Sequence, residues 1–167
     1  MRSTKQELRQ QLKADRLAMP RSDVATKSRE VSRKLISKLD WANIKNLHIY
    51  CTVPEWNEIQ AEPIVEYAHK SWPKIRIAQA PTAWNQPLPT RQFDLIIVPC
   101  LGFDRDLNRL GLGAGFYDRF LVTQPKALKI GLCFASGLVE AGLPNESHDI
   151  RLDAIVTEDN IYKTVVV

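Results

Sequence analysis

The stretch that decides the fold consists of Phe93-Asp-Leu-Ile-Ile-Val-Pro99 and, after a short connection, Arg109-Leu-Gly-Leu-Gly-Ala-Gly-Phe-Tyr-Asp-Arg119. The first part is a short apolar run, which is typical of a buried strand. The second part places three alternating glycines after that strand, which predicts a loop leaving the edge of a sheet. Open α/β sheets bind their ligands at this edge.

The three glycines of this loop are suited to binding an anion. Gly111, Gly113 and Gly115 lack a Cβ, so they can adopt positive φ and let phosphate oxygens approach backbone N–H groups. A helix that begins near Gly115 would point its first N–H groups at the same anion. The loop is not a P-loop, because no Gly-Lys-Ser/Thr follows, and its spacing differs from the dinucleotide fingerprint. For the glycines alone, a tight turn that binds no ligand remains an alternative.

Charged residues around the glycines favour a ligand. A carboxylate next to a phosphate site is repelled unless a cation lies between them, so Asp118 predicts Mg²⁺ with phosphate oxygens as its other ligands. Arg109 and Arg119 offer forked N–H donors for the same phosphates. The loop is therefore a candidate site for a phosphate-bearing ligand with a metal ion.

Length and composition fit one globular domain that spans residues 1–167. The chain is 44% hydrophobic and 25% charged, which is ordinary for a soluble protein. The N-terminus is polar and lacks the apolar segment of a secretory signal, and the longest apolar stretch, at 95–103, is too short to span a bilayer. We therefore expect a cytoplasmic protein that does not bind membranes.

The charge and the cysteines exclude other classes of site. The net charge is +4, but the basic residues between Lys5 and Lys45 are interleaved with acidic ones, which predicts a solvated helix face. No zinc-finger spacing or RNA-binding signature is present, so we expect no nucleic-acid partner. Cys51, Cys100 and Cys133 lie in or beside apolar runs and are odd in number, which favours reduced core thiols over disulfides or a zinc site.

The hydrophobic pattern predicts two helices before a sheet. Thr4-x-x-Glu7 is a capping-box pattern for the first helix, which ends at Pro20, and Ser22 or Asp23 can cap the second. Strands are predicted at 47–52, 74–79, 94–98, 129–134 and 154–157, with helices at 62–72 and 115–122. This alternation predicts an α/β fold: a single-domain sandwich with a largely parallel, Rossmann-like sheet flanked by helices.

Several segments resemble one enzyme family, in the order in which they occur along the chain. The most specific are Asp94-Leu-Ile-Ile-Val-Pro-Cys-Leu-Gly-Phe-Asp104 and Asn108-Arg-Leu-Gly-Leu-Gly-Ala-Gly-Phe-Tyr-Asp-Arg-Phe-Leu121. The others are the Lys5-x-x-x-Arg9 pair, the segment 50–59, and Leu143-Pro-Asn-Glu-Ser-His-Asp149 with residues 152–158 after it. Together they closely resemble the 5-formyltetrahydrofolate cyclo-ligase family, also called 5,10-methenyltetrahydrofolate synthetases.

The resemblance implies a NagB/RpiA/CoA transferase-like fold and an ATP-dependent cyclisation. In this family 5-formyltetrahydrofolate is converted to 5,10-methenyltetrahydrofolate with release of ADP and phosphate. The formyl oxygen is phosphorylated, N10 attacks the formyl carbon, and phosphate leaves. The implied ligands are ATP, Mg²⁺ and a reduced folate. We expect the protein to be a monomer. No protein nucleophile is required, so no catalytic side chain is assigned.

The resemblance also implies a role for individual residues. The nucleotide would contact Lys5, Arg9, Arg109, Gly111, Leu112, Gly113, Ala114, Gly115, Phe116, Tyr117 and Arg119. The folate would contact Val53, Glu58, Trp84 and Phe116. The magnesium ion would lie between Asp118 and Asp149. Lys5 and Arg9 are four residues apart, so on a helix they share a face and could grip the phosphates together from across the cleft.

Some of these assignments have structural alternatives. Phe116 and Tyr117 could serve as core anchors, as aromatic residues beside glycines often do. Glu58 could be a helix N-terminal charge. His148 and Asp149 could form an acid–base pair, although no nucleophile is paired with them.

The chain departs from the family pattern in three places. Leu112 and Ala114 occupy positions that are often basic or glycine, Ala61 replaces a common threonine, and the segment 77–93 is shorter than in many members. Two alternatives therefore remain open. One is a related ATP-dependent enzyme acting on another small substrate, and the other is a noncatalytic nucleotide-binding module.

Overall fold

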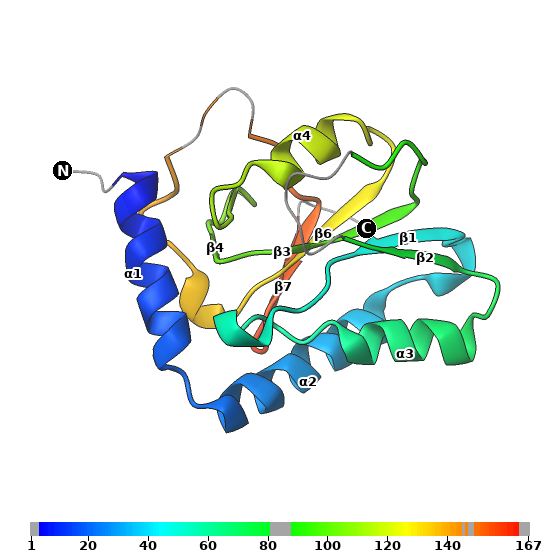
Figure 1. The fold of residues 1–167 in the computed structure, drawn as a ribbon, viewed down its shortest axis with the longest axis horizontal. Coiled ribbons are helices and arrows are strands. Elements are labelled where there is room, and N and C mark those ends of the chain that lie inside the picture. Colours follow the sequence, from blue (N-terminus) through cyan, green and yellow to red (C-terminus); the bar gives the residue numbers. More distant parts are fainter. Residues whose placement is uncertain (1–3, 81–87, 145, 147–148, 164–167) are drawn as a thin grey trace.

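The computed structural model describes residues 4–80, 88–144, 146 and 149–163. Figure 1 shows a central sheet with helices on both faces and a further helix that stands beside one end of the sheet. Trp84 and His148 lie outside the described residues. Within the described part, none of the helices combines the length and the apolar character that crossing a membrane requires.

Six strands form the central sheet in the order β2-β1-β3-β6-β7-β8. Their bounds are Asn46–Ile49 (β1), Arg76–Gln79 (β2), Leu95–Pro99 (β3), Leu128–Leu132 (β6), Ala154–Val156 (β7) and Ile161–Lys163 (β8). Neighbouring strands are parallel except for β7 and β8, which are antiparallel. The predicted α/β class with a largely parallel sheet is therefore confirmed.

The strand β3 lies at the centre of the core, as its apolar sequence predicts. Leu95, Ile96 and Ile97 are fully buried, because helices cover both faces of a parallel sheet. From β1 the chain proceeds to β2 on one side, and from β3 it proceeds to β6 on the other. The crevice between the carboxyl ends of β1 and β3 is therefore the switch point at which α/β sheets bind ligands.

The helices cover the sheet in two layers. Figure 1 shows α2 (Arg21–Lys38) and α3 (Glu62–Ser71) together on one face and α4 (Phe116–Val122) on the other. The helix α1 (Lys5–Ala18) contacts the short 3₁₀ turn η2 (Pro54–Trp56), which follows β1. Two further 3₁₀ turns are Trp41–Asn43 and Ala135–Gly137. This arrangement places α1 beside the ligand-binding end of the sheet.

The first helix begins as predicted and the second does not. The Thr4 hydroxyl accepts from the Glu7 N–H at 3.2 Å, and the Glu7 carboxylate accepts from the Thr4 N–H at 2.8 Å, which confirms the capping box. The expected cap at Ser22 or Asp23 is wrong. The second helix begins at Arg21, and the carbonyl of Pro20 accepts the first N–H groups without any side-chain cap.

Three short strands were not predicted. β4 (Gly102–Phe103) and β5 (Arg109–Leu110) form an antiparallel pair that leads into the glycine loop. Each has two residues, which is too short for a recognisable alternation of apolar and polar side chains. β8 is a half-buried edge strand whose few residues give an equally weak signal. The hairpin matters for function because it fixes Arg109 at the start of the loop.

Candidate active site

A large cavity lies between α1 and the loop that follows β5. Its volume is about 760 Å³, which is within the range of small-molecule sites. The residues that line it are Thr4, Lys5, Gln6, Arg9, Lys13, Arg16, Trp56, Glu58, Pro99, Cys100, Leu101, Arg109, Gly111, Leu112, Gly113, Ala114, Gly115, Phe116, Tyr117, Asp118, Glu146 and Asp149. The cavity thus unites residues from both ends of the chain at the predicted edge of the sheet.

The glycine loop has the conformation that its sequence predicts at two of three positions. Gly113 has φ +103° and Gly115 has φ +67°, and both lie in the region that favours glycine. The expectation of positive φ at Gly111 is wrong, because this residue directly follows β5 and keeps an ordinary φ. Gly115 is the N-cap of α4. Its carbonyl oxygen accepts a hydrogen bond from the Arg119 N–H, with an N···O distance of 3.2 Å.

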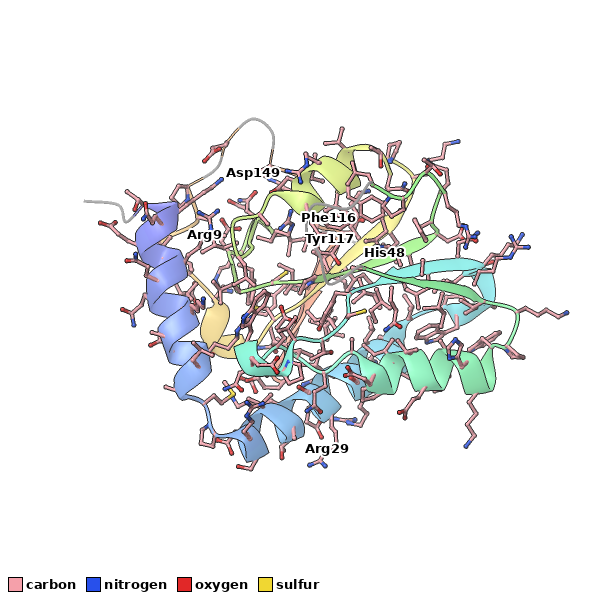
Figure 2. All side chains as sticks on the ribbon, in the orientation of Figure 1. Arg9, Arg29, His48, Phe116, Tyr117 and Asp149 are labelled. Atoms are coloured by element: carbon pink, nitrogen blue, oxygen red, sulfur yellow. The ribbon has the colours of Figure 1, made fainter. Side chains whose placement is uncertain are left out.

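The helix α1 is fastened to this loop by the two basic residues that its sequence singles out. Arg9 Nε donates to the carbonyl of Gly111 at 3.0 Å. Lys5 Nζ lies 2.6 Å from Asp149 Oδ2 and 3.1 Å from Glu146 Oε1. Burial lowers the pKa of Lys5, but the two carboxylates outweigh it and raise the pKa above its usual value. Figure 2 shows Arg9 projecting from α1 toward the middle of the molecule.

Each carboxylate predicted to bind metal is held by a basic side chain. Arg109 Nη2 donates to Asp118 Oδ1 at 2.5 Å, and Lys5 pairs with Asp149. Both carboxylates line the cavity. The described residues contain no cluster of three or more histidine, cysteine or acidic side chains arranged to hold a metal ion. The donor set therefore suits a metal that takes one or two protein carboxylates and completes its shell with ligand oxygens, as Mg²⁺ does.

The predicted folate residues divide into those that line the cavity and those that support it. Glu58 is buried at the cavity wall and its Oε2 accepts from the Val53 N–H at 2.9 Å. Burial raises the pKa of Glu58, while the Val53 N–H and the Arg16 charge act in the opposite direction. Val53 is half-buried and does not line the cavity, so its backbone positions Glu58 instead. Phe116 lines the cavity directly.

The two aromatic residues of the loop form a wall of the cavity. The rings of Phe116 and Tyr117 meet edge to face with centroids 5.1 Å apart. The Arg109 guanidinium carbon lies 5.9 Å from the centroid of the Tyr117 ring. The Tyr117 hydroxyl and Arg109 Nε are buried and have no hydrogen-bond partner among the described residues.

Arg119 is oriented differently from the other predicted residues. Its Nη1 donates to the carbonyl of Ala114 at 3.3 Å, and the side chain is exposed and absent from the cavity lining. The guanidinium therefore braces the backbone of the glycine loop. Leu112 and Ala114, by contrast, do line the cavity.

Lys13, Arg16 and Trp56 are among the cavity residues that the sequence did not predict. The first two continue the row that starts with Lys5 and Arg9, since positions 5, 9, 13 and 16 lie on one face of a helix. Arg16 is only 7% exposed. The complete row of four basic residues could have indicated that this face of α1 turns toward a ligand.

The cysteines are free, and two of them are buried. Cys100 lines the cavity, but burial raises the pKa of its thiol to about 12. Burial also raises the pKa of Cys133. Neutral thiols are poor nucleophiles. For Cys100 and Cys133 the predicted reduced core thiols are confirmed, whereas Cys51 is only partly buried.

Comparison with protein families agrees with this geometry. The model of the 5-formyltetrahydrofolate cyclo-ligase family matches residues 1–75 and 65–158. The 5-formyltetrahydrofolate cyclo-ligase of Mus musculus is 28% identical, over 95% of this chain and 95% of its own. The 5-formyltetrahydrofolate cyclo-ligase of Escherichia coli K12 is 40% identical over 54% of this chain and 50% of its own.

Solved structures share the fold along nearly the whole chain. The 5,10-methenyltetrahydrofolate synthetase of Mycoplasma pneumoniae superposes with a TM-score of 0.79 at 24% identity, covering 93% of this chain and 99% of that one. The synthetase of Aquifex aeolicus gives a TM-score of 0.78, also at 24% identity, with coverages of 98% and 94%. Because the family model accounts for most of the sequence, the chain belongs to the 5-formyltetrahydrofolate cyclo-ligase family.

Proposed function

We propose that the protein uses ATP to convert 5-formyltetrahydrofolate into 5,10-methenyltetrahydrofolate, with release of ADP and phosphate. The observation that best supports this is that one cavity joins two chemically different ends. One end of the cavity is basic and is lined by Lys5, Arg9 and the backbone of the loop 111–115. The other end holds the buried carboxylate of Glu58. A triphosphate and a nitrogen heterocycle need these two environments.

The basic end is suited to the phosphates of ATP. Gly113 is exposed and has no Cβ to block an approaching anion, and Arg9 lies close to it. Arg9 uses Nε on the Gly111 carbonyl, which fixes the guanidinium beside the loop. Phosphoryl transfer depends mainly on such positioning and on neutralising charge.

The acidic end is suited to the pterin ring of the folate. Glu58 is 4% exposed, and a buried carboxylate is stable only when it accepts hydrogen bonds. The Val53 N–H satisfies one oxygen. The amino and ring N–H groups of a pterin would supply further donors, and Phe116 and Tyr117 would pack against the flat ring.

The proposed reaction forms two bonds and breaks three. Transfer of the γ-phosphoryl group to the formyl oxygen releases ADP and turns that oxygen into a leaving group. N10 then attacks the formyl carbon and closes the ring. The carbon–oxygen bond breaks, phosphate departs with the formyl oxygen, and the N10 proton is lost with it. The protein holds the two reactants in contact and contributes no nucleophile.

Mg²⁺ would supply charge neutralisation between the phosphates and the carboxylates of Asp118 and Asp149. Both carboxylates line the cavity at its basic end, and their number fits the usual share of protein ligands in nucleotide sites. Arg109 and Lys5 keep these carboxylates oriented through the ion pairs described above.

The proposal is tested by mixing purified protein with Mg-ATP and 5-formyltetrahydrofolate and following near-ultraviolet absorbance. We expect the band of methenyltetrahydrofolate to grow only when ATP is present, and Asp118→Ala to abolish its growth. An unchanged spectrum with folded wild-type protein would overturn the proposal. Binding of Mg-ATP without turnover of any folate would then favour the noncatalytic nucleotide-binding module. Turnover of ATP with another substrate would favour a related enzyme.

The partners and the location follow from the proposed chemistry. A reduced folate and ATP are small soluble molecules, so we propose a cytoplasmic monomer that needs neither nucleic acid nor membrane. Sedimentation of the purified protein at the mass of one chain would support this.

A further inference from the structure

Arg16 is a buried cation in the cavity with no described partner for two of its nitrogen atoms. The residue is 7% exposed, and its Nε and Nη2 are buried without a hydrogen bond among the described residues. Burial lowers the pKa of the guanidinium, which reflects the loss of water around the charge. Unpaired buried donors destabilise a folded protein. A ligand that accepts hydrogen bonds from this side chain would therefore offset the loss of stability.

A dedicated connection holds Arg16 in this position. Asn57 Nδ2 donates to the carbonyls of Arg16 and Met19, each at 3.0 Å. Asn57 itself is buried and adopts the left-handed conformation at φ +49°, which asparagine tolerates better than most residues. The end of α1 is therefore fastened to the residue immediately before Glu58.

Because Asn57 fastens α1 next to Glu58, the Arg16 donors and the Glu58 acceptor lie on the same wall of the cavity. Glu58 is the strongest attractive charge acting on Arg16. No ion pair or hydrogen bond joins the two side chains within the described residues. Both line the cavity. The separated guanidinium and carboxylate form a site for a flat ligand edge that carries an acceptor beside donors.

We propose that Arg16 is a specificity residue that donates to the 4-oxo oxygen of the pterin while Glu58 accepts from its N3–H and 2-amino groups. The proposal rests on the proposed function, since it takes a reduced folate as the occupant. The 2-amino-4-oxo edge presents one acceptor next to two donors, which matches the order of the two side chains. Arginine suits the position because its planar, permanently charged head keeps its donors fixed.

The pairing predicts discrimination between two nearly identical ligands. In the 4-amino-4-deoxy analogue of 5-formyltetrahydrofolate, an N–H donor replaces the oxygen and would face the Arg16 donors. N3 of the analogue also carries no hydrogen, so an acceptor would face Glu58. A hydrogen bond to a charged group corresponds to about a 10- to 100-fold change in affinity. Wild-type protein should therefore bind the 4-oxo ligand at least about 10-fold more tightly than the 4-amino analogue.

The test is calorimetric titration of both ligands into wild-type protein and Arg16→Met, each saturated with Mg²⁺ and a non-hydrolysable ATP analogue. Methionine keeps an unbranched, flexible stem and removes every donor. We expect the variant to bind 5-formyltetrahydrofolate about 10- to 100-fold more weakly and its preference for the 4-oxo ligand to shrink at least about 10-fold, which leaves only the contribution of N3 opposite Glu58. Its affinity for the ATP analogue should be unchanged, and its thermal midpoint should not fall, because the lost charge was unpaired.

A matched control is Arg29→Met. Arg29 is an exposed arginine of α2, and its Nη2 donates to Thr26 Oγ1 at 3.2 Å. Figure 2 shows it pointing away from the cavity. This variant should retain both affinities.

The outcomes separate the two proposals. If wild-type protein turns over 5-formyltetrahydrofolate while Arg16→Met binds it within twofold of wild type or keeps the full wild-type preference for the 4-oxo ligand, Arg16 has no role in recognition. A loss of binding accompanied by a lowered thermal midpoint and weaker ATP binding would show a structural role and also overturn the inference. Failure of wild-type protein to bind or convert the folate would overturn the proposed function itself.

Discussion

Replacing His48 with phenylalanine should make the protein more resistant to acid. His48 lies on β1 and is 1% exposed, and neither ring nitrogen has a hydrogen-bond partner among the described residues. Its ring packs against Phe93, Phe120 and Tyr117, with centroids 5.2, 4.6 and 6.1 Å away. Figure 2 shows it next to the aromatic wall of the cavity. A phenylalanine ring therefore suits the same space.

The size of the effect follows from the pKa. Burial lowers the pKa of His48 from 6.5 to about 4. Below pH 6.5 the unfolded chain binds a proton that the folded protein rejects, so stability falls as the pH drops and the loss is complete near pH 4. The full effect is about 3 kcal/mol, of which about 2 kcal/mol arises between pH 6.5 and 5. Above pH 6.5 the residue contributes no pH dependence.

The assay is urea unfolding of wild-type protein, His48→Phe and the exposed-site control His69→Gln at pH 7 and pH 5. The difference in unfolding free energy between the two pH values should be smaller by about 2 kcal/mol in His48→Phe than in wild type. The control should behave like wild type, because His69 is exposed on α3. Parallel behaviour of His48→Phe and wild type would refute the assignment of a buried neutral histidine.

Three further changes test the site. Asn57→Ala removes two hydrogen bonds of 3.0 Å to the end of α1 and places alanine at φ +49°. Urea unfolding should therefore show that the free energy of unfolding falls by about 2 to 4 kcal/mol. A fall below about 0.5 kcal/mol would contradict the role of Asn57 in docking α1. Gly113→Ala forces a side chain into φ +103° and should weaken ATP binding about tenfold in calorimetry. Gly111→Ala should weaken it less, because φ at that residue is ordinary. Equal losses of ATP affinity in the two variants would argue against a conformational cause. Lys5→Met removes a cation from the basic end of the cavity. It should raise the KM for ATP about tenfold and change the KM for folate little. An equal rise in both KM values would indicate a general disturbance of the cavity.

The sheet and the glycine loop were predictable because their signals are local. The apolar run before Pro99 and the glycines after Arg109 each impose a conformation on their own residues. The pairing of Lys5 with Arg9 followed from helical spacing. The family resemblance implied that both side chains reach across the cleft to the phosphates. Their contacts with Asp149 and Gly111 were not predicted, because nothing in the helix itself indicates what it packs against.

The remaining features depend on contacts between distant segments. Arg16 resembles a solvated residue at the end of a basic helix, and only the fold buries it beside Glu58. Val53 was expected to touch the folate, but it acts through its backbone N–H on Glu58. Arg119 was expected at the phosphates and instead braces Ala114. Sequence indicated which segments meet at the cavity, and tertiary packing determined which residues line it.

The central claim is that the formyl oxygen leaves as part of phosphate. It is tested most directly by supplying 5-formyltetrahydrofolate labelled with ¹⁸O in the formyl group, together with Mg-ATP, and examining the released phosphate by ³¹P NMR or mass spectrometry. We predict one ¹⁸O atom in each phosphate formed, in step with the growth of methenyltetrahydrofolate absorbance. Unlabelled phosphate, with the label in water or retained in the folate, would contradict the proposed function.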